Sequence, residues 1–151
     1  MMEDNPFLER LSITTAQDYD INFAELLALV SALQRDTTLK TLAFFHHSSI
    51  SLYLTDDEVK QLVPILMKNY GLEHILQGIS CEDDRTVESI LRLNGAGRRY
   101  LIEDGSSISK GVDVLSTVSD DIDCVFLHLL ENPSLCDRRA AETATRAQSP
   151  P

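Results

Sequence analysis

"LKTLAF" at residues 39–44 is the middle one of three similar stretches, with "LERLSI" at 8–13 before it and "LEHILQ" at 72–77 after it. The first two have apolar residues at their first, fourth and sixth positions, and the third has them at its first and fourth. Alternation of apolar and polar residues at the end of such a run is typical of a short strand. The three starts lie 31 and 33 residues apart. The sequence therefore predicts one short strand that is used three times.

A helical pattern follows the first two of these strands. "FAELLALVSAL" at 23–33 has apolar residues at steps of three and four, which is the period of an amphipathic helix. Residues 59–66 repeat the same apolar face at a constant offset of 33, after Thr55 and Glu58, which have the spacing of a capping box. Each unit is thus a strand, a loop and a helix. Because one such unit cannot bury its apolar faces alone, a fixed period of this size predicts a stack of units.

This pattern resembles the leucine-rich repeat family of the ribonuclease-inhibitor type, whose units follow LxxLxLxxN, then a loop and a helix. The resemblance covers roughly residues 7–102. It departs from the family pattern at Ala16 and His47, where an asparagine or cysteine is usual, and at Gln77, where an inward apolar residue is expected. "SILRLNGAGRRYL" at 89–101 is similar to the closing unit of such arrays, with Asn94 at the family's asparagine position.

The predicted architecture is an α/β leucine-rich-repeat solenoid of about three to four units with a C-terminal helical cap. Repeat units span 7–102, the helical cap spans 103–136, and a disordered tail spans 137–151. We expect a fourth strand at Ile90, Leu91 and Leu93, although residues 87–93 also fit a helix. Two short cap helices are predicted, broken near Ser119. Their apolar residues would cover the last exposed edge of the array, and these residues are Val112, Leu115, Val118, Ile122, Val125, Phe126, Leu129 and Leu130.

The amino-acid composition limits the classes of partner and the cellular compartments that we expect for this protein. The net charge of −11 opposes binding to nucleic acid or to anionic membranes. No run approaches the about 20 apolar residues of a membrane span, and the acidic start does not resemble a signal peptide. Three cysteines without CxxC spacing indicate neither a disulfide framework nor a zinc site. We expect a cytoplasmic or nuclear protein. No cap precedes the first strand, so this edge could belong to a truncated array or support self-association.

No stretch predicts catalysis, a metal or a cofactor. His46 and His47 are adjacent, so on a strand they point to opposite faces and would rarely share one metal with Asp56 or Asp57. Cys81 is followed by three acids, which raise a thiol pKa and disfavour a nucleophilic thiolate. The glycines at 94–99 and 105–111 lack the order of residues that a phosphate loop requires.

The residues between the inward leucines predict a binding surface. If the leucines face the helices, the alternate residues project from the concave side of the sheet. Phe45 and Leu76 would form its apolar centre, unless they contact the 46–54 loop instead. The whole predicted surface comprises Arg10, Ser12, Thr41, Ala43, Phe45, His74 and Leu76.

The family resemblance implies interaction, since relatives act as inhibitors, adaptors and regulators of small GTPases. The first hypothesis is a non-catalytic module that binds another protein through this concave face. A second is a structural C-terminal remnant of a longer repeat protein without activity of its own. A third is a metal- or nucleotide-dependent enzyme.

Overall fold

The computed structural model describes residues 8–14, 22–34, 38–45, 52–76, 79–81, 85–99 and 108–136. Within them the chain is a mixed α/β protein with five α-helices and small parallel sheets. The elements are β1 (Arg10–Thr14), α1 (Phe23–Ala32), β2 (Thr41–Phe45), β3 (Leu52–Leu54), α2 (Asp56–Leu66), β4 (His74–Leu76), β5 (Ile79–Cys81), α3 (Thr86–Gly95), α5 (Ile108–Thr117), α6 (Ile122–Glu131) and the 3-10 helix η1 (Pro133–Cys136). None of the helices in these ranges has the length and apolarity to cross a membrane. The predicted disordered tail at 137–151 lies outside the described residues.

The three repeated stretches form neighbouring parallel strands. The main sheet has the order β1-β2-β4, and each strand begins two residues after the start of its stretch. The register aligns equivalent positions, so that Arg10 pairs with Thr41 and Thr41 pairs with His74. A second, two-stranded parallel sheet pairs β3 with β5. The prediction of three adjacent parallel strands is therefore confirmed.

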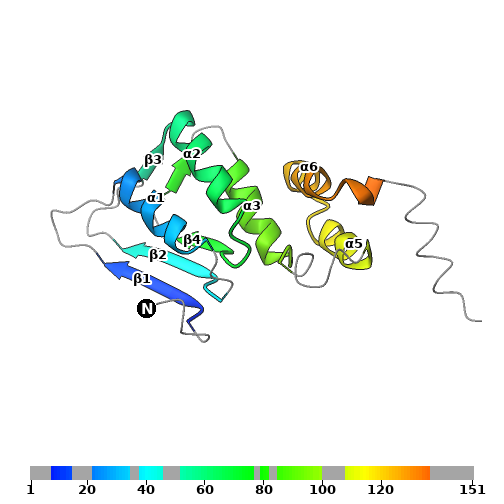
Figure 1. Cartoon of the computed structure of the whole chain (residues 1–151), viewed down its shortest axis with the longest axis horizontal. Coiled ribbons are helices and arrows are strands. Elements are labelled where there is room, and N and C mark those ends of the chain that lie inside the picture. The colour runs from blue at the N-terminus through cyan, green and yellow to red at the C-terminus, as the bar shows by residue number, and fades with distance from the viewer. Residues whose placement is uncertain are drawn as a thin grey trace, which may run out of the picture.

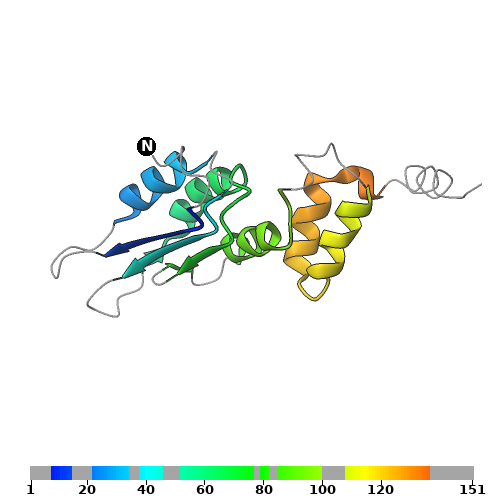
Figure 2. The ribbon, with the colours of Figure 1, turned by 90° about the horizontal axis from the view of Figure 1, so that it is seen from below.

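Helices α1 and α2 cover one face of the main sheet (Figures 1 and 2). Leu42, at the centre of the sheet, is fully buried with Leu26, Val30 and Leu62 of these helices. Leu11 of β1 is half-buried and packs against the same cluster. The apolar residues that set the strand and helix periods thus meet in one core, as their spacing predicts.

The helix starts follow their capping signals. Asn22 is the N-cap of α1, and its side chain accepts a hydrogen bond from the backbone N–H of Glu25 at 3.1 Å. At α2, the carboxylate of Glu58 accepts from both the backbone N–H and the hydroxyl of Thr55, each at 2.8 Å. Helix α2 continues through Pro64 and ends two residues later, so the proline lies close to the helix end.

One local prediction about a strand is wrong. The fourth strand at 90–93 is instead part of helix α3. A helix places Val87, Ile90 and Leu93 on one buried face, whereas a strand of the same residues would alternate between faces.

Asparagine side chains connect one helix end to the next. Asn69, after α2, donates to the Leu33 carbonyl at 2.6 Å and accepts from the backbone N–H groups of Gly71 and Leu72. Asn94, near the end of α3, donates to the carbonyls of Asn69 and Leu72 at 2.9 and 2.8 Å. Both side chains are buried. Because buried carbonyl and N–H groups need partners, these bonds hold the ends of successive units together.

The two predicted cap helices are present as α5 and α6, and they form a hairpin beside α3 (Figures 1 and 2). Their shared core consists of Leu93, Val114, Val118 and Cys124. The prediction of which residues cover the array is wrong in part, since four of its apolar residues are mainly exposed: Val112, Ile122, Phe126 and Leu130.

Candidate protein-binding surface

The face of the main sheet opposite α1 and α2 carries the predicted binding residues. We call it the open face and define it by Arg10, Ser12 and Thr14 of β1, Thr41 of β2 and His74 of β4, which alternate with the inward apolar residues. Along β1 the alternation is complete, with these three residues exposed and the two between them half-buried. The pleat therefore separates a core side from a polar side.

The in-register pairing places the open-face residues in rows across the strands. One row is Arg10, Thr41 and His74, with the outer two exposed and the central threonine half-buried. The side chains of Arg10, Ser12 and His74 make no hydrogen bond or ion pair within the described residues. Their polar groups are thus available to a partner.

The second row corrects one predicted residue. Ala43 lies on the central strand, paired in register with Ser12 on one side and Leu76 on the other. Its exposed fraction is 0%. Ala43 therefore offers no accessible surface to a partner. The backbones of Phe45 and Leu76 belong to β2 and β4, but their side chains lie outside the described part of the structure, so the predicted apolar centre is not described.

Charged residues flank the strand starts. Lys40 precedes β2 and forms an ion pair with Glu9 at 3.2 Å. The backbone N–H groups of Thr41 and His74 donate to the carbonyls of Glu9 and Lys40, which carries the parallel ladder across the three strands. The ion pair of Lys40 and Glu9 therefore lies beside the first residues of β1 and β2, at one edge of the open face.

The alternative chemical sites have no assembled geometry within the described ranges. There, no group of three or more His, Cys, Asp or Glu residues could hold a metal ion. His46 and His47 lie outside these ranges, and only the backbone of Cys81 is described. Asp57 is exposed on α2, where it pairs with Lys60 at 3.0 Å. Burial raises the pKa of the Cys124 thiol, which lies 3.6 Å from the Ser89 carbonyl, so this cysteine is held as a thiol.

Sequence reasoning missed how Arg98 is used. Its side chain is buried, and its Nε donates to Glu131 of α6 at 2.6 Å while Nη2 donates to both Glu131 and the Met67 carbonyl. Nη1 donates to the Asn94 amide oxygen at 3.1 Å, and the guanidinium carbon lies 4.6 Å from the ring centroid of Tyr70. The place of Arg98 at the centre of a junction between α2, α3 and α6 could not be read from local spacing.

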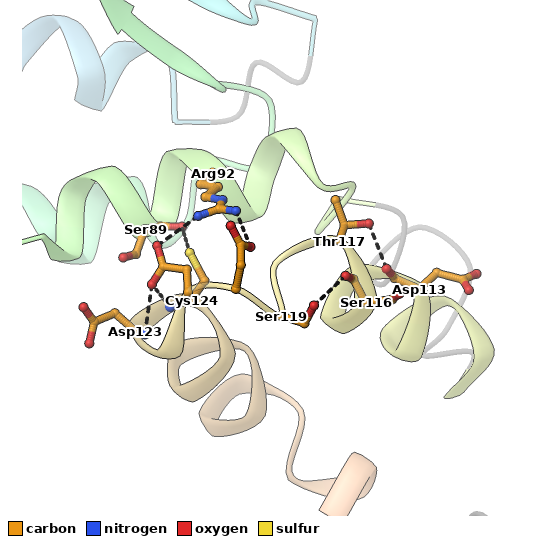
Figure 3. A network of polar contacts seen from close by, with 10 residues as sticks. Ser89, Arg92, Asp113, Ser116, Thr117, Ser119, Asp123 and Cys124 are labelled. Atoms are coloured by element: carbon orange, nitrogen blue, oxygen red, sulfur yellow. Dashed lines mark hydrogen bonds and ion pairs between the residues drawn. The ribbon is translucent and has the colours of Figure 1, made fainter.

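A second junction joins α3 to the loop before α6 (Figure 3). Arg92 bonds the carboxylates of Asp120 at 2.5 Å and Asp121 at 3.2 Å. Asp121 also caps α6, accepting from the backbone N–H groups of Asp123 and Cys124. The N–H of Cys124 is the largest cause that lowers the pKa of Asp121, so this carboxylate stays ionised beside Arg92. Asp120 and Asp121 therefore have a structural role, because they hold the start of α6 against α3.

A buried histidine lies between α6 and α5. The Nε2 atom of His128 is 3.1 Å from the Gly111 carbonyl, so Nε2 carries the hydrogen and donates it. Its Nδ1 atom is buried without a hydrogen-bond partner. Burial is the largest cause and lowers the pKa of His128; the Gly111 hydrogen bond and the Glu131 charge oppose it, and the Arg98 charge adds a smaller lowering effect. The imidazole is therefore neutral in the folded protein at neutral pH.

A scan against protein-family models and searches of curated proteins and of solved structures find no match to this chain. The function of the chain is therefore inferred from its residues and their geometry.

Proposed function

We propose that this chain is a short leucine-rich-repeat array of the ribonuclease-inhibitor-like type with a C-terminal helical cap. The order strand then helix recurs along the chain, and the strands pair in parallel with equivalent residues aligned. Short strands β3 and β5 also recur before α2 and α3 and pair with each other. Both recurrences support stacked, equivalent units.

The array acts, in this proposal, as a non-catalytic module that binds another protein through its open face. One observation carries the proposal: the main sheet is parallel, yet among the described residues only one of its faces is covered by helices. Parallel sheets are ordinarily covered on both faces. A parallel sheet whose second face exposes unpaired polar side chains, such as Arg10 and His74, is suited to receive a partner there.

The experiment compares two variants that make the same change in net charge. Arg10→Glu with His74→Glu alters the open face, and Lys68→Glu with Gln61→Glu, called the α2 variant, alters one exposed position on α2 and one in the turn after it. Proteins captured by the wild-type chain from an extract of its own cells are identified and purified. The dissociation constant of each is then measured by calorimetry with all three forms of the chain.

We expect the open-face variant to bind at least about tenfold more weakly, which corresponds to roughly 1.4 kcal/mol and to the loss of one energetically important contact. The α2 variant should bind like the wild type. Equal affinity of both variants would contradict binding through the open face. A wild-type chain that captures no partner would favour the alternative of a structural remnant.

A further inference from the structure

Helix α6 has apolar residues on every side, and three large ones on one face are exposed. Ile122, Phe126 and Leu130 are 76%, 64% and 65% exposed. They are spaced four residues apart, so they lie one above another along a single face of the helix. We call these three residues the outer stripe. Single exposed apolar residues are ordinary, but an aligned row of large ones on an anchored helix marks an interaction surface.

The opposite face of α6 fixes the outer stripe in place. Cys124 and His128 are both 0% exposed, Cys124 bonds the Ser89 carbonyl of α3, and His128 bonds the Gly111 carbonyl of α5. Glu131 is held by Arg98. Because α6 has contacts to α3 and α5 on this side, it cannot turn to bury the outer stripe without breaking them.

The described segment that carries the outer stripe is acidic. Residues 108–136 contain five acids and one lysine, and their histidine is buried. Three of the acids bond arginines of α3 and of the turn after it, as described above. The remaining two, Asp113 on α5 and Asp123 on α6, have exposed side chains. Asp123 follows Ile122 directly, so an exposed acid stands beside the outer stripe.

We propose that the outer stripe binds a basic amphipathic helix of a partner protein, at a site separate from the open face. A row with one side chain per turn, about 12 Å long from Ile122 to Leu130, matches the apolar side of a crossing helix. A lysine or arginine beside that apolar side would meet Asp123. A membrane surface fits poorly, because helices that lie on anionic membranes need a basic border.

A second copy of the chain also fits poorly. Antiparallel packing of two α6 helices would bring the exposed Asp123 of one helix against the negative C-terminal end of the other. No exposed basic side chain of α6 would offset this repulsion, and each chain carries a net charge of −11. The charges therefore favour a basic partner over self-association.

The probe is a labelled synthetic peptide of leucine and lysine only, about four helical turns long, with its leucines on one face. A control peptide has the same composition in an order without an apolar face. Binding is followed by fluorescence anisotropy with the full chain, with Phe126→Gln plus Leu130→Gln, and with Tyr53→Gln. Tyr53 is the matched control, because it is 66% exposed on β3, away from α6. Circular dichroism checks folding, and Ile122→Gln replaces the double variant if that variant does not fold.

We expect the α6 variant to raise the dissociation constant at least about tenfold, and Tyr53→Gln to leave it unchanged. Asp123→Asn should weaken binding and reduce its dependence on salt. Equal binding of the control peptide, or unchanged binding by the α6 variant, would overturn the proposal. So would a wild-type dimer in sedimentation that the α6 variant abolishes, since the occupant would then be a second copy. Binding only by a chain ending at Cys136 would identify residues 137–151 as the occupant.

Discussion

Replacing Arg98 by methionine tests whether the buried arginine holds α6 against the ends of α2 and α3. Methionine keeps most of the aliphatic stem and removes the guanidinium group. The change leaves three acceptors without their donor: the Glu131 carboxylate, the Asn94 amide oxygen and the Met67 carbonyl. It also removes the cation that lies over the Tyr70 ring.

The magnitude follows from how little water can replace the arginine. A buried acceptor left unsatisfied costs about 1–3 kcal/mol, and Asn94 is 2% exposed. The Glu131 side chain is 22% exposed, so water recovers part of its loss. Breaking a buried ion pair by removing one partner typically costs about 3–5 kcal/mol. We expect Arg98→Met to lower the free energy of unfolding by an amount in that range.

The assay is urea unfolding followed by circular dichroism, with a double-mutant cycle. Glu131→Leu alone should also destabilise the protein, and the double variant should lie about 2 kcal/mol closer to the wild type than the sum of the single changes, because no unpaired charge then remains. Arg92→Met is the control, since Arg92 pairs with acids at an exposed position and should change stability far less. A loss below about 1 kcal/mol for Arg98→Met, or additive single changes, would refute the reasoning.

Three further predictions follow from single residues. Asn69→Asp keeps the acceptor oxygen but loses the donor to the Leu33 carbonyl, so we expect urea unfolding to show a loss of about 2–4 kcal/mol. The pKa of His128 is lowered below its ordinary 6.5 in the folded state, so the unfolded chain binds more protons in acid. The free energy of unfolding should therefore fall as the pH drops below 6.5. In thermal unfolding, His128→Gln should remove this part of the pH dependence. Thr55→Ala removes the hydroxyl that donates to Glu58 and should lower the free energy of unfolding by about 1 kcal/mol. A urea midpoint equal to that of the wild type would contradict this prediction.

The sequence predicted those features whose signals lie within one unit. Strand spacing predicted the parallel neighbours, because a repeat at a fixed interval aligns equivalent residues. The capping residues Asn22 and Thr55 likewise stand beside the helices that they start. The segment 87–93 was ambiguous, because its apolar residues fit either period, and burial against α2 and α6 decides for a helix.

Other features depend on residues far apart in the chain. Asn69 bonds a carbonyl 36 positions earlier, and Arg98 bonds Glu131 33 positions later, so no local pattern indicates either contact. Helix α6 has apolar residues on every side, and periodicity therefore cannot tell which side is buried. Ala43 shows the same limit on the open face, since alternation gives the direction of a side chain but not whether its neighbours leave it accessible.

The asparagine contacts have a consequence for how this chain can change. Asn69 and Asn94 join successive helix ends through carbonyl and N–H groups, which every residue except proline supplies alike. Arg10 and His74 contribute nothing to that joining. Substitutions at Arg10 and His74, natural or engineered, can therefore change the outer surface while the strands and helices keep their alignment.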